Sequence, residues 1–168
     1  GAVGPRVFSP AGESGVGLWY MEQDQRQLIA VEGQATPGLE GATFVSLPSY
    51  DGLLVNGLGQ VVFSALLAGP QFSQGQGGSL WLRDIDGSVR MLVREGDILH
   101  TPQGDVPFDF ASPVGFNDAG QLLLLANRFG FDQALVLTSV PVPEPSSLLL
   151  AGIGALALGF ALRRRRTA

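Results

Sequence analysis

The side chains best suited to acid–base chemistry lie close together in the second half of the chain. His100 is the only histidine, and Asp97 precedes it by three positions. A histidine base needs an orienting carboxylate and a nucleophile beside it. No Gly-x-Ser-x-Gly turn, which would present a serine nucleophile, occurs in the chain. We therefore expect His100 to be a solvated loop residue rather than a catalytic base.

A pair of carboxylates could also hydrolyse a glycosidic bond, one as the acid and the other as the base or nucleophile. The candidates are Glu95, Asp97, Asp105 and Asp109. Exposed acids are the expected background, because the chain before residue 141 has 14 acidic residues against six arginines. We predict that the protein is not an enzyme and has no catalytic residues. A carbohydrate-active hydrolase or lyase is the alternative, and it requires two convergent acidic or histidine side chains in one pocket.

The stretch Asp84-x-Asp86-Gly87 matches the first half of an oxygen-ligand loop for calcium. Glu95 stands at the twelfth position counted from Asp84, but the residues between them are typical of a strand. The corresponding loop at residues 22–25 lacks the pattern. We therefore interpret the stretch as a hairpin turn. Asp84 and Asp86 remain a weak calcium candidate, and we predict neither a metal ion nor a cofactor.

Aromatic side chains could stack on sugar rings. Trp19 and Trp81 occupy the same place in two similar segments and are flanked by leucine, so we expect both to be core residues. A module that binds polysaccharide or protein would instead expose aromatic side chains in its loops. The sequence offers Phe72, Phe108 and Phe129 for that role.

Four landmarks recur in the same order at nearly the same spacing, which indicates an internal repeat. The shifts are 62, 63, 61 and 65 residues, so the period is about 62. They relate, in turn, residues 17–20 to 79–82, 31–33 to 94–96, 56–63 to 117–124, and 4–5 to 69–70. The residues that define the repeat are Trp19, Gly33, Asn56, Gly59, Phe63, Trp81, Gly96, Asn117 and Gly120.

Each of the two units is predicted to form four short strands. The expected strands of the first unit are 18–21, 28–32, 43–47 or 53–56, and 60–67. Those of the second unit are 80–83, 89–95, 111–116 and 121–127, and a last strand spans 133–140. Asparagine at the first position and glycine at the fourth, as in Asn56-x-x-Gly59, are typical of a type I turn.

The fourth strand of each unit is apolar on both faces, as expected where sheets stack on sheets. Glycine and proline total 35 of the 168 residues, and no segment before Leu148 has a helical period. The sequence therefore predicts an all-β body over residues 1–140. We expect tandem four-stranded repeats, arranged either as β-propeller-like blades or as a stacked β array.

The composition excludes several classes of function. The body carries a net charge of −8, whereas nucleic-acid binding needs a basic surface. The chain contains no cysteine, so it can form neither a disulfide framework nor a zinc–thiolate site. We predict no nucleic-acid partner.

The last 28 residues form a different kind of segment. Residues 148–162 are 15 apolar residues without a charge, and as a helix they would span about 22 Å. With flanking serines and snorkelling arginines this approaches the length of a transmembrane helix. Arg163, Arg164, Arg165 and Arg166 follow it, so the positive-inside rule places the arginine tail in the cytoplasm and the body outside. Residues 141–147 form a proline-rich linker between body and helix.

The tail resembles the PEP-CTERM protein-sorting signal, in which a Pro-Glu-Pro motif precedes an apolar run and an arginine cluster. The motif residues here are Pro143, Glu144 and Pro145. In that family, exosortase, a membrane-embedded cysteine transpeptidase of exopolysaccharide-producing Gram-negative bacteria, recognises the motif. The resemblance implies export, an inner-membrane precursor and cleavage near the motif.

The body resembles exported tandem-repeat proteins whose repeat is written NxxGxxxF. Asn56, Gly59 and Phe63 match this signature, while the second copy has Leu124 in place of phenylalanine. The 4–5 to 69–70 offset would place Gly1 within a fourth strand, level with Leu66, and the chain begins without methionine or a signal peptide. We therefore expect an N-terminally truncated piece of a longer repeat protein.

Together these features predict an exported, non-enzymatic protein of the cell surface or extracellular matrix. Its precursor is expected in the inner membrane with the body in the periplasm, and its processed form at the surface or outside the cell. Its expected partners are exosortase, the inner membrane, and exopolysaccharide or matrix proteins of a biofilm. A polysaccharide- or protein-binding propeller module is the first alternative.

Overall fold

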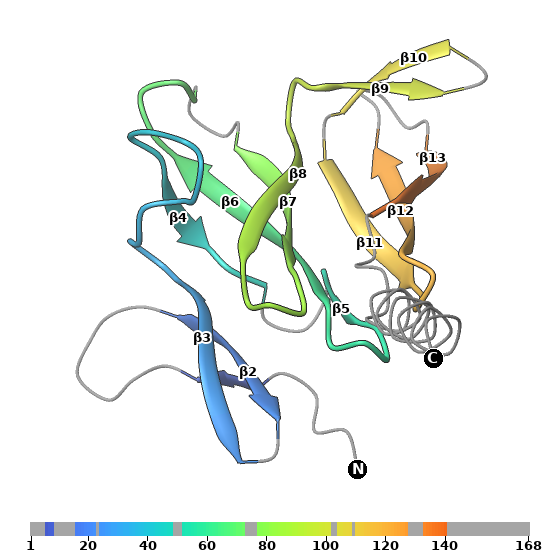
Figure 1. Ribbon diagram of the computed structural model, residues 1–168. Helices are drawn as coiled ribbons and strands as arrows, with labels where there is room; N and C mark the ends of the chain where they lie inside the picture. The colour runs from blue at the N-terminus through green and yellow to red at the C-terminus, as the bar shows by residue number, and fades with distance from the viewer. Residues whose placement is uncertain are drawn as a thin grey trace, which may run out of the picture.

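The computed structural model describes residues 6–8, 16–22, 24–48, 52–72, 77–101, 104–108, 110–127 and 133–140. Their regular secondary structure is all β, as the sequence predicted (Figure 1). The strands are β1 (Arg6–Phe8), β2 (Gly17–Glu22), β3 (Gln25–Val31), β4 (Thr43–Ser46), β5 (Leu53–Val55), β6 (Val61–Ala68), β7 (Gly78–Arg83), β8 (Val89–Arg94), β9 (Ile98–Thr101), β10 (Gly104–Pro107), β11 (Phe110–Phe116), β12 (Gln121–Asn127) and β13 (Gln133–Ser139).

The strands form three antiparallel sheets and one separate hairpin. The N-terminal sheet has the order β1-β2-β3. The central sheet has the order β4-β6-β7-β8, with β5 also paired to β6. The C-terminal sheet has the order β11-β12-β13, and β9 and β10 form the hairpin between the last two sheets. The N-terminal and C-terminal sheets are meanders, because neighbouring strands follow one another along the chain and short turns can join antiparallel neighbours. In the central sheet, β6, β7 and β8 follow the same order, but β4 pairs with β6 rather than with β5.

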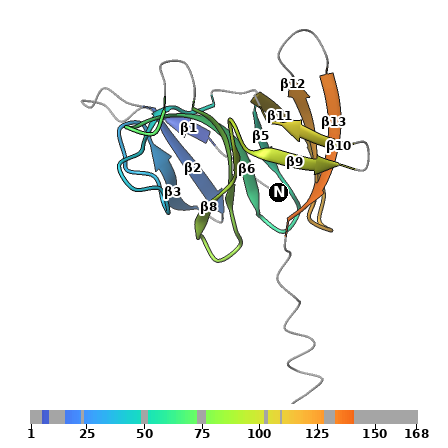
Figure 2. The same cartoon turned by 90° about the horizontal axis from the view of Figure 1, so that it is seen from above.

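The three sheets lie face to face in sequence order (Figure 2), and the central sheet is covered on both faces. Alternate side chains of β6 point in opposite directions, as a strand requires. Phe63 packs with Trp81 toward the N-terminal sheet, and Val62 packs with Leu80 toward the C-terminal sheet. All four side chains are fully buried. This explains why the sequence of β6 is apolar on both faces.

The sheets do not coincide with the predicted four-stranded units, and this expectation was wrong. The central sheet joins the last strands of the first unit, β5 and β6, to the first strands of the second unit, β7 and β8. The reason is that β6 and β7 pair antiparallel, with Phe63 opposite Trp81. Both candidates for the third strand also form, because β4 and β5 pair with different parts of β6.

Two further expectations are corrected by the strand pairing. Arg6 lies opposite Trp19 in β2, as Phe63 lies opposite Trp81 in β7. Arg6 therefore takes the position in the N-terminal sheet that Phe63 takes in the central sheet. The shift that related residues 4–5 to 69–70 does not agree with this equivalence and is wrong. The β9–β10 hairpin was not predicted, and it places His100 in a strand rather than a loop.

Two turns with the same hydrogen bonds occur 61 residues apart. The Gly59 amide donates to the Asn56 carbonyl oxygen at 3.1 Å, and the Gly120 amide donates to the Asn117 carbonyl oxygen at 3.0 Å. In both turns the asparagine Nδ2 donates to the side chain of the following glutamine, Gln60 or Gln121, at 2.8 Å. Both glycines have a positive φ, 81° and 74°, which glycine adopts without strain.

These two turns also contact each other. The Asn56 Nδ2 donates to the carbonyl oxygen of Asn117 at 3.2 Å, and the Gly57 amide donates to the carboxylate of Asp118. At the other end of the sheets, the two repeat glycines also make equivalent hydrogen bonds. There the Gly33 amide donates to the Phe44 carbonyl oxygen at 2.7 Å, and the equivalent bond from Gly96 to Phe108 measures 2.8 Å.

Candidate functional site

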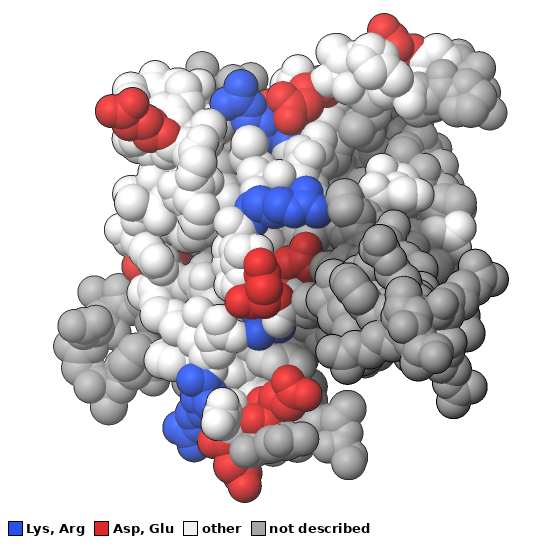
Figure 3. All heavy atoms as spheres, in the orientation of Figure 1, with Lys and Arg blue, Asp and Glu red and all other residues white. Residues whose placement is uncertain are grey.

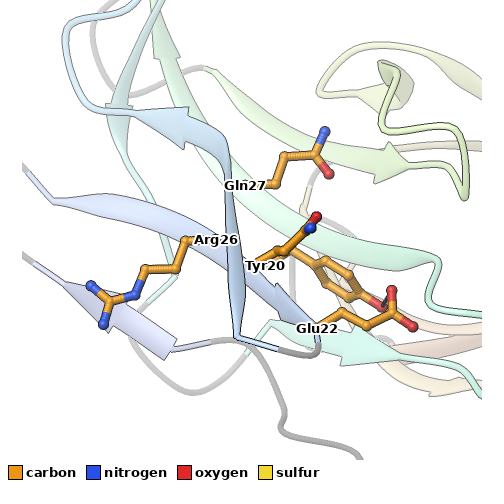
Figure 4. Close-up of a pocket in the computed structure, with 5 residues that line it drawn as sticks. Tyr20, Glu22, Arg26 and Gln27 are labelled. Atoms are coloured by element: carbon orange, nitrogen blue, oxygen red, sulfur yellow. Dashed lines mark hydrogen bonds between the residues drawn. The ribbon is translucent and has the colours of Figure 1, made fainter.

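A cleft lies at the end of the N-terminal sheet, where the β2–β3 hairpin meets the turns of the central sheet (Figure 4). It has a volume of about 360 Å³. Its lining comes from polar residues of two paired strands, with Tyr20 opposite Gln27 and Glu22 opposite Gln25. The lining residues are Tyr20, Glu22, Gln25, Arg26 and Gln27. In Figure 4, Tyr20 and Glu22 lie together on one side, and Arg26 points away from them.

Arg83 of β7 supports this cleft from the central sheet. Its guanidinium lies 4.0 Å from the centre of the Tyr20 ring, within the range of a cation–π contact. One terminal nitrogen donates to the Gly59 carbonyl oxygen at 2.9 Å, and the other donates to Gln27 Oε1. Arg83 is only 6% exposed, and its Nε has no partner among the described residues. A buried cation therefore holds the Tyr20 ring and the Gln27 amide in fixed positions.

The surroundings of Tyr20 disfavour ionisation of its phenol. Burial of the side chain, first, and then the negative charge of Glu22 raise the pKa of Tyr20 above its ordinary value of 10.0. Arg83 acts in the opposite sense, and the hydroxyl of Tyr20 donates to Glu22 Oε2 at 3.3 Å. Tyr20 is therefore a neutral hydrogen-bonding group at physiological pH.

The turns beside the cleft are rich in acidic residues, and Figure 3 shows acidic side chains (red) on the lower part of this face with basic ones among them. The acidic residues of the described turns and strand ends here are Glu22, Asp24, Asp84, Asp86 and Asp118. The cleft thus combines an aromatic ring, two side-chain amides and a carboxylate. This set of groups suits a ligand that carries many hydroxyl groups.

The residues proposed for acid–base chemistry have other partners or lie apart. His100 Nδ1 lies 2.7 Å from Asp105 Oδ1 across the β9–β10 hairpin, and both side chains are largely exposed. Glu95 Oε2 accepts hydrogen bonds from the amides of Gly77 and Gly78 at 2.8 and 3.3 Å. Asp97 accepts from the Arg94 amide at 3.0 Å.

Of the remaining hydrolase candidates, Asp109 lies outside the described residues. None of the described candidates lines the cleft at Tyr20.

The calcium candidates form a hairpin turn between β7 and β8. The Gly87 amide donates to the Asp84 carbonyl oxygen at 3.0 Å, and Asp84 Oδ1 accepts from the Ile85 amide and from Gln60 Nε2. The hydroxyl and amide of Ser88 donate to the Asp86 carboxylate and lower its pKa. In the described part of the chain, no three acidic or histidine side chains are grouped to hold a metal ion.

The two tryptophans have different environments. Trp81 is fully buried, and its Nε1 donates to Ser79 Oγ at 2.9 Å. Trp19 is half-buried on the outer side of the N-terminal sheet, and its Nε1 has no partner among the described residues. The predicted exposed aromatics do not fit that role: Phe108 is 2% exposed and Phe72 packs against the core. Phe129 lies outside the described residues.

Several functional or structural groups were missed in the sequence. Glu32 accepts hydrogen bonds from the Val16 and Leu47 amides, as Glu95 does from Gly77 and Gly78. The signal was present, since a glutamate precedes the repeat glycine in both units. Glutamine likewise follows Asn-x-x-Gly twice, and Gln60 is fully buried. Nothing in the spacing of Tyr20 and Arg83 indicated their contact, which forms between two sheets.

Comparison with known protein families gives one match to the body. The matching model is a family of unknown function, DUF7453, over residues 9–149. The chain belongs to this family. The DUF7453 region includes the cleft and all strands from β2 to β13. The resemblance to the NxxGxxxF proteins stays a prediction. No curated protein and no solved structure matches the chain.

A second family model, the PEP-CTERM protein-sorting motif, matches residues 141–166. This confirms the resemblance of the tail, which marks an exported protein with a membrane-anchored precursor and exosortase as its processing partner. Pro143, Glu144, Pro145 and the arginines at 163–166 lie outside the described residues. So does the apolar run at 148–162, and no helix in the described part is long and apolar enough to cross a membrane.

Proposed function

We propose that the protein is a non-enzymatic component of the cell surface or extracellular matrix of an exopolysaccharide-producing Gram-negative bacterium. The observation that carries this proposal is the PEP-CTERM motif directly after an all-β body. The non-enzymatic role is supported by the partners of the acidic residues. Glu95 and Asp97 accept backbone hydrogen bonds, and Asp105 pairs with His100 on an exposed hairpin.

In this proposal the tail acts as a temporary membrane anchor. The apolar run at 148–162 spans the inner membrane, and the arginines at 163–166 stay in the cytoplasm. The body then lies in the periplasm. Pro143 and Pro145 keep the motif extended, because proline cannot donate a backbone hydrogen bond and disfavours helix before it. Exosortase can therefore reach the backbone around Glu144.

A double substitution in the motif tests the role of the tail. Pro143→Ala with Pro145→Ala leaves the apolar run and the arginines unchanged, and Ser146→Ala is the matched control. The double variant should remain in the inner-membrane fraction as an uncleaved precursor, while the control is processed like the parent protein. Release of the double variant at the parent level would contradict the proposal.

For the body we propose that its sheets are consecutive β-propeller-like blades of a tandem-repeat array. Three antiparallel sheets that pack face to face support this arrangement, as do the matching hydrogen bonds of the Asn56 and Asn117 turns. The sheets also cross the unit boundary, since β6 and β7 of successive units pair. Such pairing links each unit to the next and makes their folding cooperative.

The cleft at Tyr20 favours polysaccharide as the ligand of this body. It offers an aromatic ring beside a carboxylate and side-chain amides, and Arg83 holds the ring in place. Surface plasmon resonance with the host's purified exopolysaccharide tests this role. Tyr20→Ala should weaken binding at least tenfold, whereas Leu58→Ala, at an exposed position, should leave it unchanged. Equal binding by all three proteins would exclude the cleft.

A further inference from the structure

The residues that line the cleft at Tyr20 belong to two opposite faces of the N-terminal sheet. Tyr20 packs against the core shared with the central sheet, and Gln27 lies opposite it in β3. Because side chains alternate along a strand, Glu22 and its partner Gln25 lie on this same inner face. Arg26 stands between Gln25 and Gln27 and therefore lies on the outer face, and Figure 4 shows it pointing away. Among the lining residues, Glu22 is thus the one charged group on the inner side of the cleft.

A cation, Arg83, lies beside this inner face but is enclosed by protein groups. Its terminal nitrogens donate to the Gly59 carbonyl oxygen and to Gln27 Oε1, and its guanidinium lies 4.0 Å from the centre of the Tyr20 ring. Arg83 is 6% exposed and its Nε is buried, whereas Glu22 is exposed. No ion pair joins Glu22 to an arginine in the described part of the chain. A ligand in the cleft therefore contacts the negative charge directly, while protein groups separate it from the positive one.

The turns around the cleft add further negative charge. Asp24 lies in the β2–β3 turn, and Asp84 and Asp86 lie in the β7–β8 turn. The β7–β8 turn adjoins the cleft, because a side chain added at Gly87 would collide with the Gln27 amide. The carboxylates of Asp84 and Asp86 accept hydrogen bonds from uncharged amide and hydroxyl groups, which do not neutralise them.

Arg90 lies near the same turn but on the opposite face of the central sheet. It pairs with Leu82, and Leu82 packs toward the C-terminal sheet. Paired residues of an antiparallel ladder share a face, so Arg90 points away from the cleft. The charges that face the cleft are therefore mainly negative. Such a field attracts a cationic ligand and disfavours an anionic one.

We propose that the cleft selects a polysaccharide whose sugar rings carry free, protonated amino groups, with Glu22 as the residue that determines this specificity. The Glu22 carboxylate accepts the ammonium group in a charge-assisted hydrogen bond, which is roughly twice as strong as a neutral one. Tyr20 contacts the sugar ring, and the amides of Gln25 and Gln27 bind its hydroxyl groups. The cleft volume of about 360 Å³ lies in the usual range for small-ligand sites, about 300–1,000 Å³. This inference rests on the proposed binding of polysaccharide and names the ligand class for that same site.

Calorimetric titration of the full chain in detergent with three tetrasaccharides tests the ligand class. The probes are the tetrasaccharide of glucosamine, its fully N-acetylated form, and the tetrasaccharide of galacturonic acid, at a slightly acidic pH that keeps the amines protonated. We expect the glucosamine form to bind about tenfold more tightly than the acetylated form, because only its amines are charged. Glu22→Gln should remove this difference and leave binding of the acetylated form unchanged. Glu40→Gln, at an exposed position away from the cleft lining, should keep the difference.

The Tyr20→Ala variant separates failure of this inference from failure of the proposed function. If the acetylated or the acidic tetrasaccharide binds at least as tightly as the glucosamine form, and Tyr20→Ala abolishes that binding, the cleft binds sugars but not through an ammonium group. A preference for glucosamine that persists in Glu22→Gln would show general attraction to an acidic body and would also overturn the inference. If none of the three probes binds while exopolysaccharide binding still depends on Tyr20, the amino-sugar assignment alone is refuted. Exopolysaccharide binding that is unchanged in Tyr20→Ala would refute both proposals.

Discussion

Replacing each tryptophan in turn by alanine tests whether equivalent positions of two sheets differ in burial. Trp81 is fully buried against Phe44 and Phe63, with ring centres 5.0 and 6.5 Å away. Removing a buried tryptophan costs about 3–5 kcal/mol of stability, which includes the cavity left behind. Trp19 is half-buried, and we expect its removal to cost roughly 1–2 kcal/mol.

The assay is urea unfolding of the full chain in detergent, followed by far-ultraviolet circular dichroism. With a slope of about 2 kcal/mol per molar urea, Trp81→Ala should lower the midpoint by about 2 M and Trp19→Ala by less than about 1 M. If Trp81→Ala does not fold, Trp81→Phe replaces it in the test. We expect Trp81→Phe to lower the free energy of unfolding by about 1–2 kcal/mol, because it removes the indole hydrogen bond. Equal losses at the two tryptophans would refute the assigned packing.

Three further predictions concern the cleft and the glutamates. Gly59→Ala should destabilise by roughly 1–3 kcal/mol in thermal unfolding, because the new Cβ would lie 2.6 Å from the Tyr20 hydroxyl at a φ of 81°. In ultraviolet titration Tyr20 should ionise above 10.0, and Glu22→Gln should lower its pKa. The pKa of Tyr20 is raised in the folded state, so its protonated phenol contributes to the stability of the fold below pH 10.0. This contribution is lost as the pH rises through the raised pKa. Glu95→Gln should lose about 1–2 kcal/mol, because the charged acceptor of two amides is removed.

Matched changes serve as controls. Gly38 has a φ of 73° but nothing within 4 Å of a new Cβ, so Gly38→Ala reports backbone strain alone. If it costs as much as Gly59→Ala, the close approach to Tyr20 is unimportant. Glu40→Gln, at an exposed position, should change stability by less than about 0.5 kcal/mol. The titration is done in a Tyr50→Phe background, so that Tyr20 is the only tyrosine observed. A pKa of 10.0 for Tyr20 would contradict the assigned burial.

Local signals in the sequence predicted most of the strands, because turn residues and apolar patterns act over short distances. Residues 121–127 form a strand with the predicted bounds, and the turn at Asn56 has the expected hydrogen bond from Gly59. Strand partners were harder to predict. The pairing of Phe63 with Trp81 depends on a connection across the unit boundary, and the periodic pattern alone does not reveal it.

The candidate site was missed for a similar reason. Tyr20 and Arg83 are 63 positions apart and meet only because two sheets pack face to face. The tail motif, by contrast, is a contiguous signal that is read directly from the residue order. Phe108, which a binding module would have exposed, instead packs in the core between the central and C-terminal sheets.

The most direct test of the central claim is the intact mass of the protein from its native host, with and without exosortase. The account predicts that the host with the enzyme yields a product that has lost the residues after about Glu144, and that the host without it retains the whole tail. A product that keeps residues 148–168 in both hosts would contradict the account. The apolar run would then be a permanent anchor, and the body would function at the inner membrane.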